Sequence, residues 1–344
     1  MTGNPYAKKA NEMSVLVTGG AGYIGSHMVL ELMDAGEPAV VLDNLSTGLA
    51  WAVPTGATLV EGDVGDQDLV RRLVASHGID AIIHFAGSIV VPESVADPLG
   101  YYLNNTVKSR ALIEVAVRCG IRHFIFSSTA AVYGMTGDRP VAEDAPLDPL
   151  SPYGSSKRMT EIMLADTARA HDLAYVALRY FNVAGADPQG RAGQSTPRAT
   201  HLIKVACETA LGKRPHMEVF GTDYPTADGT CIRDYIQVTD LTRAHLAALR
   251  HLRAGGGSDI FNCGYGRGFS VLEVIDAVKR ACGHDFEVRT SARRPGDPAV
   301  IVAASERIRR VLAWVPQHDT LDGIVAQALR WEERLSSMRA QGAP

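Results

Sequence analysis

Two residues in the middle of the chain, Tyr153 and Lys157, have types and spacing suited to acid–base chemistry. They follow Ser151 and Pro152, which are typical of a helix N-cap and a first helical position, so we expect a helix to begin here. Residues four apart lie on one face of a helix, which places the lysine ammonium near the tyrosine phenol. A nearby cation and the positive end of a helix both favour phenolate. The pair therefore predicts a tyrosine of lowered pKa that acts as a general base on an alcohol, although this spacing alone is common on ordinary amphipathic helices.

A second group of residues with chemical meaning lies near the start of the chain. Gly19, Gly22 and Gly25 stand between a short apolar run, 14–18, and a helical pattern that continues to Gly36. Glycine lets the backbone approach a diphosphate closely, and the N-terminus of the following helix supplies unpaired N–H groups. Such a triplet alone is weak evidence. Its position after the first predicted strand is typical of a dinucleotide-binding turn.

Acidic residues at the ends of the next two predicted strands indicate which dinucleotide fits. Asp43 ends the second strand, 18 residues after Gly25. A carboxylate in this place accepts hydrogen bonds from an adenosine ribose and repels a 2′-phosphate, so the sequence favours NAD over NADP. Asp63 and Val64 follow the third strand and can flank the adenine, but an ordinary loop acid explains Asp63 nearly as well.

The elements that must position these residues alternate between strands and helices. Apolar strands are predicted at 14–18, 39–43, 57–61, 81–85, 123–128 and 174–180, and helical segments near 66–77, 98–119 and from 152 onward. This alternation predicts an α/β fold with a doubly wound parallel sheet, of the Rossmann type.

The pattern changes after Asn182, where long loops rich in Gly, Pro and Asp separate shorter amphipathic helices. The loops lie at 184–199 and 221–231, and the helices near 200–211, 237–253, 270–282 and 320–339. We expect residues 1–13 to be a loose extension, 14–182 an NAD-binding Rossmann domain, and 183–344 mainly a smaller α/β substrate-binding region. The helix at 237–253 could instead pack back on the first domain.

Length, charge and cysteine usage exclude several classes of protein. The 344 residues carry a net charge of −4 without a long basic run, which argues against a nucleic-acid partner. No apolar segment approaches the length of a membrane span and the first residues lack the apolar core of a signal peptide, so we expect a cytoplasmic protein. Five scattered cysteines without C-x-x-C spacing and eleven histidines without H-E-x-x-H spacing predict neither a disulfide framework nor a metal site.

Short motifs spread over about residues 14–335 carry a family resemblance. They are 17–27 (VTGGAGYIGSH), 42–45 (LDNL), 61–63 (EGD), 83–87 (IHFAG), 101–105 (YYLNN), 124–129 (FIFSST), 151–154 (SPYG), 179–182 (RYFN) and 233–236 (RDYI). Together they resemble the extended short-chain dehydrogenase/reductase family, and within it most closely the UDP-galactose 4-epimerases.

The resemblance implies catalytic and cofactor-binding roles. Thr129 would hydrogen-bond the reacting sugar oxygen, Tyr153 would be the base, and Lys157 would orient the nicotinamide ribose. Thr129 could also be a strand-end hydroxyl that satisfies local backbone. The implied cofactor is NAD, with contacts at Gly19, Gly22, Tyr23, Ile24, Gly25, Asp43, Asn44, Asp63, Val64, Phe85, Ala86, Asn104, Ser127, Tyr153, Lys157 and Tyr180.

The implied substrate is a UDP-hexose. Its contacts would be Thr129, Tyr153, Asn182, His201, Leu202, Phe220, Arg233, Tyr235, Arg294 and Asp297. The planar fork of arginine suits a diphosphate, although Arg233 and Arg294 could instead form surface ion pairs. Two positions depart from a well-studied branch of the family: Ile89 replaces a lysine near the cofactor phosphates, and His201 replaces an asparagine beside the diphosphate.

The implied reaction interconverts UDP-galactose and UDP-glucose through a 4-keto sugar, in a homodimeric enzyme. Alternatives on the same scaffold are 4-epimerases of N-acetylhexosamines, pentoses or uronic acids, and nucleotide-sugar dehydratases or decarboxylases. Ala130 and Ala131 stand where dehydration commonly needs Asp-Glu, which favours epimerisation. A catalytically silent NAD-binding regulator would have no reason to keep the three catalytic residues together. Ile301 or, with a one-residue gap, Val300 stands where some relatives carry a tyrosine, so the pocket is expected to admit N-acetylated sugars.

Overall fold

The computed structural model describes residues 13–196, 199–294 and 296–340. In these residues seven parallel strands form one sheet in the order β10-β6-β5-β4-β1-β2-β3. The strands are β1 (Ser14–Thr18), β2 (Ala39–Asp43), β3 (Thr58–Glu61), β4 (Ile79–His84), β5 (His123–Thr129), β6 (Ala174–Tyr180) and β10 (Asp259–Cys263). The doubly wound sheet predicted from the alternation of strands and helices is confirmed.

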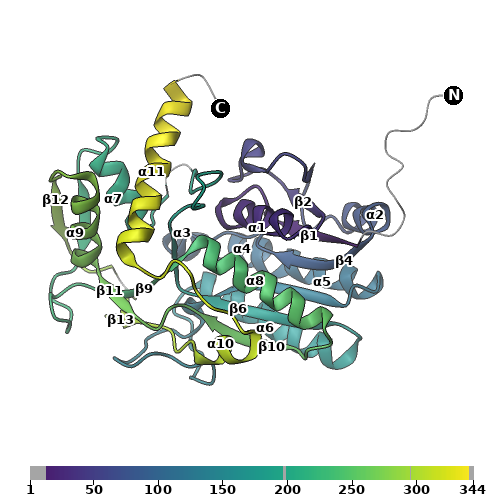
Figure 1. The fold of residues 1–344 in the computed structure, drawn as a ribbon. Helices are drawn as coiled ribbons and strands as arrows, with labels where there is room; N and C mark the ends of the chain where they lie inside the picture. Colours follow the sequence, from purple (N-terminus) through teal and green to yellow (C-terminus); the bar gives the residue numbers. More distant parts are fainter. Residues whose placement is uncertain (1–12, 197–198, 295, 341–344) are drawn as a thin grey trace.

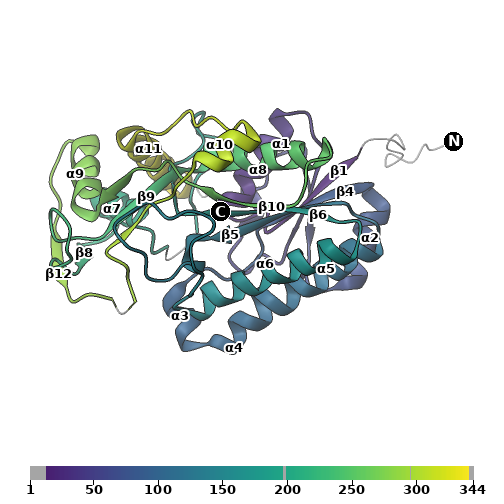
Figure 2. The ribbon, with the colours of Figure 1, turned by 90° about the horizontal axis from the view of Figure 1, so that it is seen from below.

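Helices cover both faces of this sheet (Figures 1 and 2). One face carries α2 (Gln67–His77), α5 (Lys108–Arg118) and α6 (Pro152–Ala170), and the other α1 (Tyr23–Asp34), α8 (Val238–Arg253) and α10 (Glu306–Leu312). Successive side chains of a strand point to opposite faces, so Ile125 of β5 joins the cluster under α8 while Phe124 and Phe126 join the cluster under α5 and α6. Every strand of the buried sheet must therefore be apolar along most of its length.

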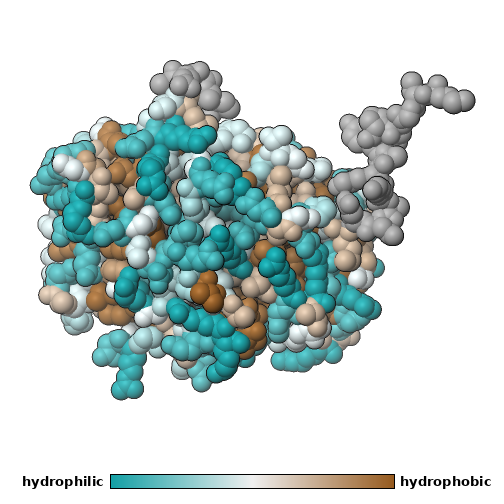
Figure 3. Space-filling model, in the orientation of Figure 1, coloured by the Kyte–Doolittle hydropathy of each residue, from teal (hydrophilic) through white to brown (hydrophobic). Residues whose placement is uncertain are grey.

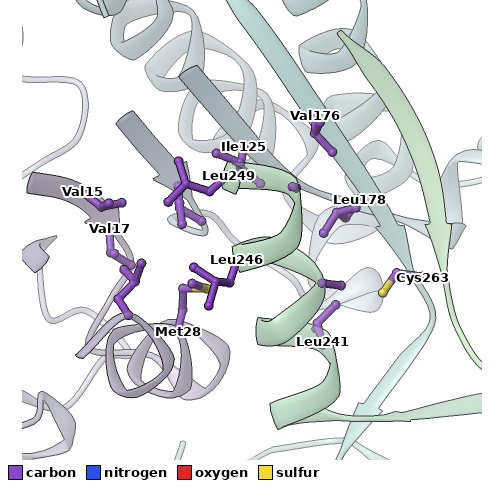
Figure 4. Close-up of a cluster of buried hydrophobic side chains, with 14 of the residues drawn as sticks. Val15, Val17, Met28, Ile125, Val176, Leu178, Leu241, Leu246, Leu249 and Cys263 are labelled. Atoms are coloured by element: carbon purple, nitrogen blue, oxygen red, sulfur yellow. The ribbon is translucent and has the colours of Figure 1, made fainter. Parts of the chain in front are cut away.

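Helix α8 is the clearest link between the later part of the chain and the large sheet. Its residues Leu241, Leu246 and Leu249 pack with Ile125 of β5 and Leu178 of β6 in one buried cluster (Figure 4). Strand β10 then pairs with β6 along its whole length. Helix α8 and strand β10 thus bring the later part of the chain back onto the large sheet. The division of function at residue 182 stays a prediction.

A smaller layer lies beyond the carboxyl ends of the large sheet (Figure 1). A four-stranded mixed sheet is centred on β9 (Ile232–Gln237), which pairs with β7 (Asn182–Ala184), β11 (Gly268–Ser270) and β13 (Val300–Ile301). Beside it β8 (Met217–Phe220) pairs with β12 (Val288–Ser291). Helices α7 (Leu202–Ala210), α9 (Val271–Cys282) and α11 (Leu321–Ala340) pack on these strands. The sequence predicts these helices but not the strands, several of which are only two to four residues long.

The predicted helix at 98–119 consists of several segments. Helix α4 (Pro98–Tyr101), which follows the short helix α3 (Val91–Ala96), leads into a π-helical turn, Tyr102–Val107, which continues directly into α5. The turn carries Asn104 and Asn105 toward the carboxyl end of β4, and such turns inside helices are frequent at functional sites. Within the described residues, no helix is both long and apolar enough to cross a membrane.

Candidate active site

The glycine-rich turn after β1 is packed too closely for any side chain. Gly19 has φ +71°, and a Cβ on it would lie 2.6 Å from the backbone nitrogen of Ala86. A Cβ on Gly25 would lie 2.1 Å from the carbonyl oxygen of Gly19, because the first turn of α1 rests directly on the turn. Gly22 is the N-cap of α1, ahead of Tyr23. These glycines leave the N–H groups at the start of α1 facing the carboxyl end of the sheet.

Asp43 closes this turn from the end of β2. Its carboxylate is buried and accepts hydrogen bonds from the backbone N–H groups of Ala21 and Leu45, each at 2.9 Å. Each carboxylate oxygen has a second lone pair for a ligand hydroxyl. Asn44 is exposed, and its side-chain oxygen accepts from the backbone and hydroxyl of Ser46. The structure therefore places Asp43, but not the Asn44 side chain, inside the turn.

Asp63 and Val64 lie at the end of the neighbouring strand β3. Asp63 accepts from Lys108 at 2.5 Å and from the backbone of Gly65 at 2.8 Å. Partial burial alone would raise the pKa of Asp63, but its hydrogen bonds and the positive charge of Lys108 together outweigh burial and lower it. Val64 is buried beneath it.

The carboxyl end of β5 and the start of α6 bring the predicted catalytic residues together. Ser151 caps α6 by accepting from the backbone N–H of Gly154 at 3.2 Å, and Pro152 takes the first helical position, as predicted. A Cβ on Gly154 would lie 2.5 Å from the carbonyl oxygen of Ala131, so this glycine lets α6 start directly against the segment that follows Thr129. Tyr153 is thereby held beside Thr129.

The three catalytic candidates are nearly removed from solvent. Thr129 and Tyr153 are each 8% exposed and Lys157 is 4% exposed. The Lys157 ammonium donates to the carbonyl oxygen of Ser127 at 2.9 Å and lies 5.0 Å from the centre of the Phe126 ring. Thr129 accepts from the backbone of Ala131 at 3.1 Å, so its hydroxyl does satisfy local backbone, while its proton remains available for another acceptor.

The pKa directions at this site correct one expectation from the sequence. Burial raises the pKa of Tyr153, and hydrogen bonding with Thr129 only partly offsets it, whereas the sequence predicts a lowered value. Burial also lowers the pKa of Lys157 to about 8. The expectation was wrong for the chain alone because desolvation acts on both groups, and helix spacing does not reveal burial.

Several predicted cofactor residues surround this edge. The Ser127 hydroxyl hydrogen-bonds the Tyr180 hydroxyl, and the ring of Phe85 packs against buried His245 with ring centres 4.8 Å apart. Asn104 donates to the hydroxyl of Ser88 at 2.9 Å. Ala86 and Ile24 pack at the two sides of the glycine turn. Ile89 is 51% exposed.

A small pocket in the second layer collects four of the predicted substrate residues. Asn182 of β7 lies opposite Tyr235 of β9, and both line the pocket with His201 and Leu202 at the start of α7. His201 shares a 2.8 Å hydrogen bond with Gln194, and burial lowers the pKa of His201.

The remaining substrate candidates form a cluster around Asp297. The Arg294 Nε atom donates to Asp297 at 2.9 Å, and the Arg294 guanidinium stacks over the ring of Phe220 at 4.8 Å. Arg233 approaches the other carboxylate oxygen of Asp297 at 3.9 Å. Two guanidinium groups and an aromatic ring next to each other suit a nucleoside diphosphate.

Comparisons with known proteins agree with this geometry. A family model described as the NAD dependent epimerase/dehydratase family matches residues 15–264. The chain belongs to this family. It is 58% identical over 331 residues to a UDP-glucose 4-epimerase of Azospirillum brasilense, covering 96% of this chain and 95% of that one.

Solved structures of the family are also similar to this chain. A UDP-glucose 4-epimerase of Brucella ovis in complex with NAD is 43% identical, with a TM-score of 0.90 over 92% of this chain and 98% of that one. A UDP-Glc/GlcNAc 4-epimerase of Campylobacter jejuni is 46% identical, with a TM-score of 0.82 over 94% and 99% of the two chains.

The glycine turn fits the NAD that this family binds. Within the described chain, no side chain caps the N-terminus of α1 and its first turn carries no acidic residue, so its N–H groups are available to a diphosphate. The space that a Cβ on Gly19 or Gly25 would fill is already taken by backbone, which keeps the turn tight. The buried Asp43 carboxylate stands where a ribose hydroxyl would donate.

The structure adds residues that the sequence did not suggest. Gln194 and Trp331 line the pocket of this family member together with the buried pair of Lys204 and Glu332. The last two residues are 128 positions apart, so local pattern carries no signal for them. Asn105 is more deeply buried than the predicted Asn104 and binds both Ser88 and Ser156. Its position beside Asn104 in the motif was a usable signal.

Proposed function

We propose that this protein is an NAD-dependent 4-epimerase that interconverts UDP-galactose and UDP-glucose through a 4-keto sugar. The observation that carries the proposal is the meeting of Thr129, Tyr153 and Lys157 at the carboxyl edge, next to a glycine turn that fits NAD. The similarity to UDP-glucose 4-epimerases over nearly the whole chain supports the same reaction.

In this proposal Tyr153 takes the proton from the 4-hydroxyl of the sugar and later returns it. The Thr129 hydroxyl, whose oxygen accepts from the backbone of Ala131, would donate its proton to the sugar oxygen. When bound, NAD supplies the acceptor and donor of the hydride at C4. Lys157 follows Tyr153 by one turn of α6, and its ammonium, when protonated, would place a positive charge at this edge that favours loss of the Tyr153 proton. The buried surroundings exclude water from the oxidised sugar.

The sugar must turn between the two halves of the reaction, so binding has to concentrate on the UDP. The Asp297 cluster, with Arg233, Arg294 and Phe220, suits the nucleotide and diphosphate. Tight hold of the UDP and loose hold of the sugar keep the reacting carbon near Tyr153 while allowing either face to be presented.

Incubation of the purified protein with UDP-galactose and no added cofactor tests this function. We expect UDP-glucose to accumulate while the absorbance of reduced nicotinamide stays low, because the cofactor is restored in each cycle. Stoichiometric reduced cofactor without an epimer, or a dehydrated product, would contradict the proposal. A dehydratase is already disfavoured, since Ala130 and Ala131 bring no carboxylate next to Thr129.

A second candidate activity is the 4-epimerisation of UDP-N-acetylglucosamine. Ile301 packs with Ala130 and Phe181 in a buried cluster, which leaves half-buried Val300 of β13 as the position whose size can affect the sugar pocket. A small valine there supports room for an N-acetyl group. Conversion of UDP-glucose without conversion of UDP-N-acetylglucosamine would remove this candidate, and Val300→Tyr should restrict a dual enzyme to hexoses.

We also infer a homodimer through one face of the large domain. Val91, Val95, Leu99, Leu103 and Val107 recur every four residues along the segments α3 to the π-helical turn, and their exposed fractions run from 41% to 79%. Met159 and Ile162 are also exposed on the adjoining helix α6, which contacts α3, α4 and the π-helical turn and lies beside α3 and α4 in Figure 2. The face that Figure 3 shows, at 90° to the view of Figure 2, mixes polar and apolar side chains. A stripe of this length suits a second copy of the same stripe.

Sedimentation velocity tests the dimer. Leu99→Glu should yield monomers at concentrations where the wild type is dimeric, whereas Val315→Glu, at a 72% exposed position before α11, should not. A monomeric wild type would contradict the interface.

We also infer a cytoplasmic location. It is supported by the five cysteines, which are all free.

A further inference from the structure

We call the place where Thr129, Tyr153 and Lys157 meet the catalytic edge. The carboxylate of Glu161 joins three elements directly behind it. It lies four residues after Lys157 on α6, on the same buried face of the helix. Ser128 of β5 donates to one carboxylate oxygen at 2.5 Å, and Arg179 of β6 donates to both oxygens at 2.9 and 2.7 Å. Ser128 and Arg179 are direct neighbours across the two strands. One carboxylate therefore ties α6 to both β5 and β6.

The same network holds the chain on both sides of Thr129. Ser128 precedes Thr129, and Tyr133 follows it by one turn. Arg179 donates to the Tyr133 hydroxyl at 3.0 Å and to the carbonyl oxygen of Glu143 at 3.1 Å. Thr129 is thus held between Ser128 and Tyr133, which hydrogen-bond to the buried pair of Glu161 and Arg179.

Stability alone is a poor explanation for this pair. The side chains of Arg179 and Glu161 are 3% and 4% exposed. Taking two charges out of water often costs more than their attraction returns, and well-packed apolar residues of similar size are often as stable or more stable. Hydrogen bonds are directional and fix the relative position of the groups that they join, whereas apolar contacts do not.

We propose that Glu161 and Arg179 are positioning residues that hold Tyr153 and Lys157 of α6 in register with Thr129 of β5. The inference rests on the proposed epimerase function. Helix α6 lies against β5 and β6 along its length (Figure 2), and apolar contacts alone would allow it to slide or rotate slightly. A displacement of about 1 Å at reacting groups lowers rates by roughly 100-fold.

The double variant E161L/R179M tests the proposal by replacing the ion pair with an apolar pair of similar volume. We expect kcat to fall by about 10- to 100-fold, with the KM for UDP-galactose and the content of bound NAD nearly unchanged. The midpoint of thermal unfolding should fall only modestly, because replacing the ion pair itself costs little while Ser128 and the Glu143 carbonyl each lose a hydrogen-bond partner. A folded double variant with wild-type kcat would overturn the proposal.

A matched control lies at the opposite end of the sheet. Arg253 of α8 binds Asp80 at the start of β4 through two hydrogen bonds of 2.9 and 2.8 Å, with side chains 18% and 17% exposed. Arg253→Met should lower the unfolding midpoint and leave kcat unchanged. If kcat instead follows the unfolding midpoint in both variants, the Glu161 pair acts through general stability and the proposal fails.

A milder variant covers the case in which the double variant does not fold. Ser128→Ala removes one hydrogen bond to Glu161 and leaves the ion pair intact. We expect kcat to fall by about two- to tenfold at unchanged KM, and no fall would overturn the proposal. A wild type that does not epimerise UDP-galactose would refute the proposed function itself, whereas an active wild type with unaffected variants would refute only the positioning role.

Discussion

The catalytic edge and the Asp297 cluster differ in how firmly the surrounding chain holds them. Tyr153 and Lys157 are 8% and 4% exposed on a helix fixed to a seven-stranded sheet, whereas the Arg294 side chain is 51% exposed on a loop. Groups that move protons need fixed geometry, so they belong on rigid buried elements. Groups that grip a diphosphate can remain partly solvated until the ligand arrives. Substitutions in the two regions should therefore affect different kinetic constants.

The largest effect is expected at the buried edge. Tyr153→Phe removes the proton acceptor without changing the packed ring, so kcat should fall by about 10²- to 10⁴-fold while KM and stability change little. Steady-state kinetics with UDP-galactose and thermal unfolding measure the two. Tyr175→Phe, at a buried tyrosine of β6 away from the carboxyl edge, is the matched control and should retain full activity. Comparable activity of Tyr153→Phe and the control would remove Tyr153 from the mechanism.

The large sheet and the second layer also differ in how well they could be predicted from the sequence. The large sheet was predictable because its strands are apolar runs between helices, and Gly19, Gly25 and Asp43 mark its nucleotide turn within a short stretch. The Ser151 cap likewise fixed the start of α6. These signals come from residues close together in the chain, so they can be recognised without knowledge of the fold.

The second layer was less predictable because its structure depends on partners far along the chain. Strand β13 has only two residues and forms through pairing with β9, and Lys204 meets Glu332 only when α7 and α11 pack together. Burial also depends on residues far along the chain. The sequence therefore predicts a lowered pKa for Tyr153, whereas burial in the fold raises it. Propensity and spacing describe neighbours on one helix but not what covers them.

An intermediate effect is expected at the Asp297 cluster. Arg294→Ala removes a charged partner of the diphosphate, and such hydrogen bonds contribute about 1.5–3 kcal/mol, so the KM for UDP-galactose should rise by roughly 10- to 100-fold. The value of kcat should change by less than about threefold, because Arg294 does not touch the reacting carbon in this scheme. Arg289→Ala, at an exposed arginine of β12 paired with Glu287, is the control and should behave as the wild type. A loss confined to kcat would show that the two regions are not separate in function.

The smallest effect concerns the free energy of unfolding that is lost because Lys157 is buried at the catalytic edge. Burial lowers the pKa of Lys157 to about 8 from an ordinary value of 10.5. Between these values the unfolded chain binds more protons than the folded chain, so the free energy of unfolding should rise with pH across this window. Lys157→Met removes this contribution. The free energy of unfolding of the wild type minus that of the variant should therefore increase by roughly 2 kcal/mol between about pH 8 and about pH 10.

Urea unfolding of the wild type and of Lys157→Met at several pH values measures this difference. Tyr153 works against the trend only at higher pH, since its raised pKa makes the folded chain the stronger proton binder above about pH 10. Equal slopes for wild type and Lys157→Met would mean that the ammonium is solvated. The catalytic edge would then be no more rigidly desolvated than the Asp297 cluster, and the contrast between the two regions would lose its physical basis.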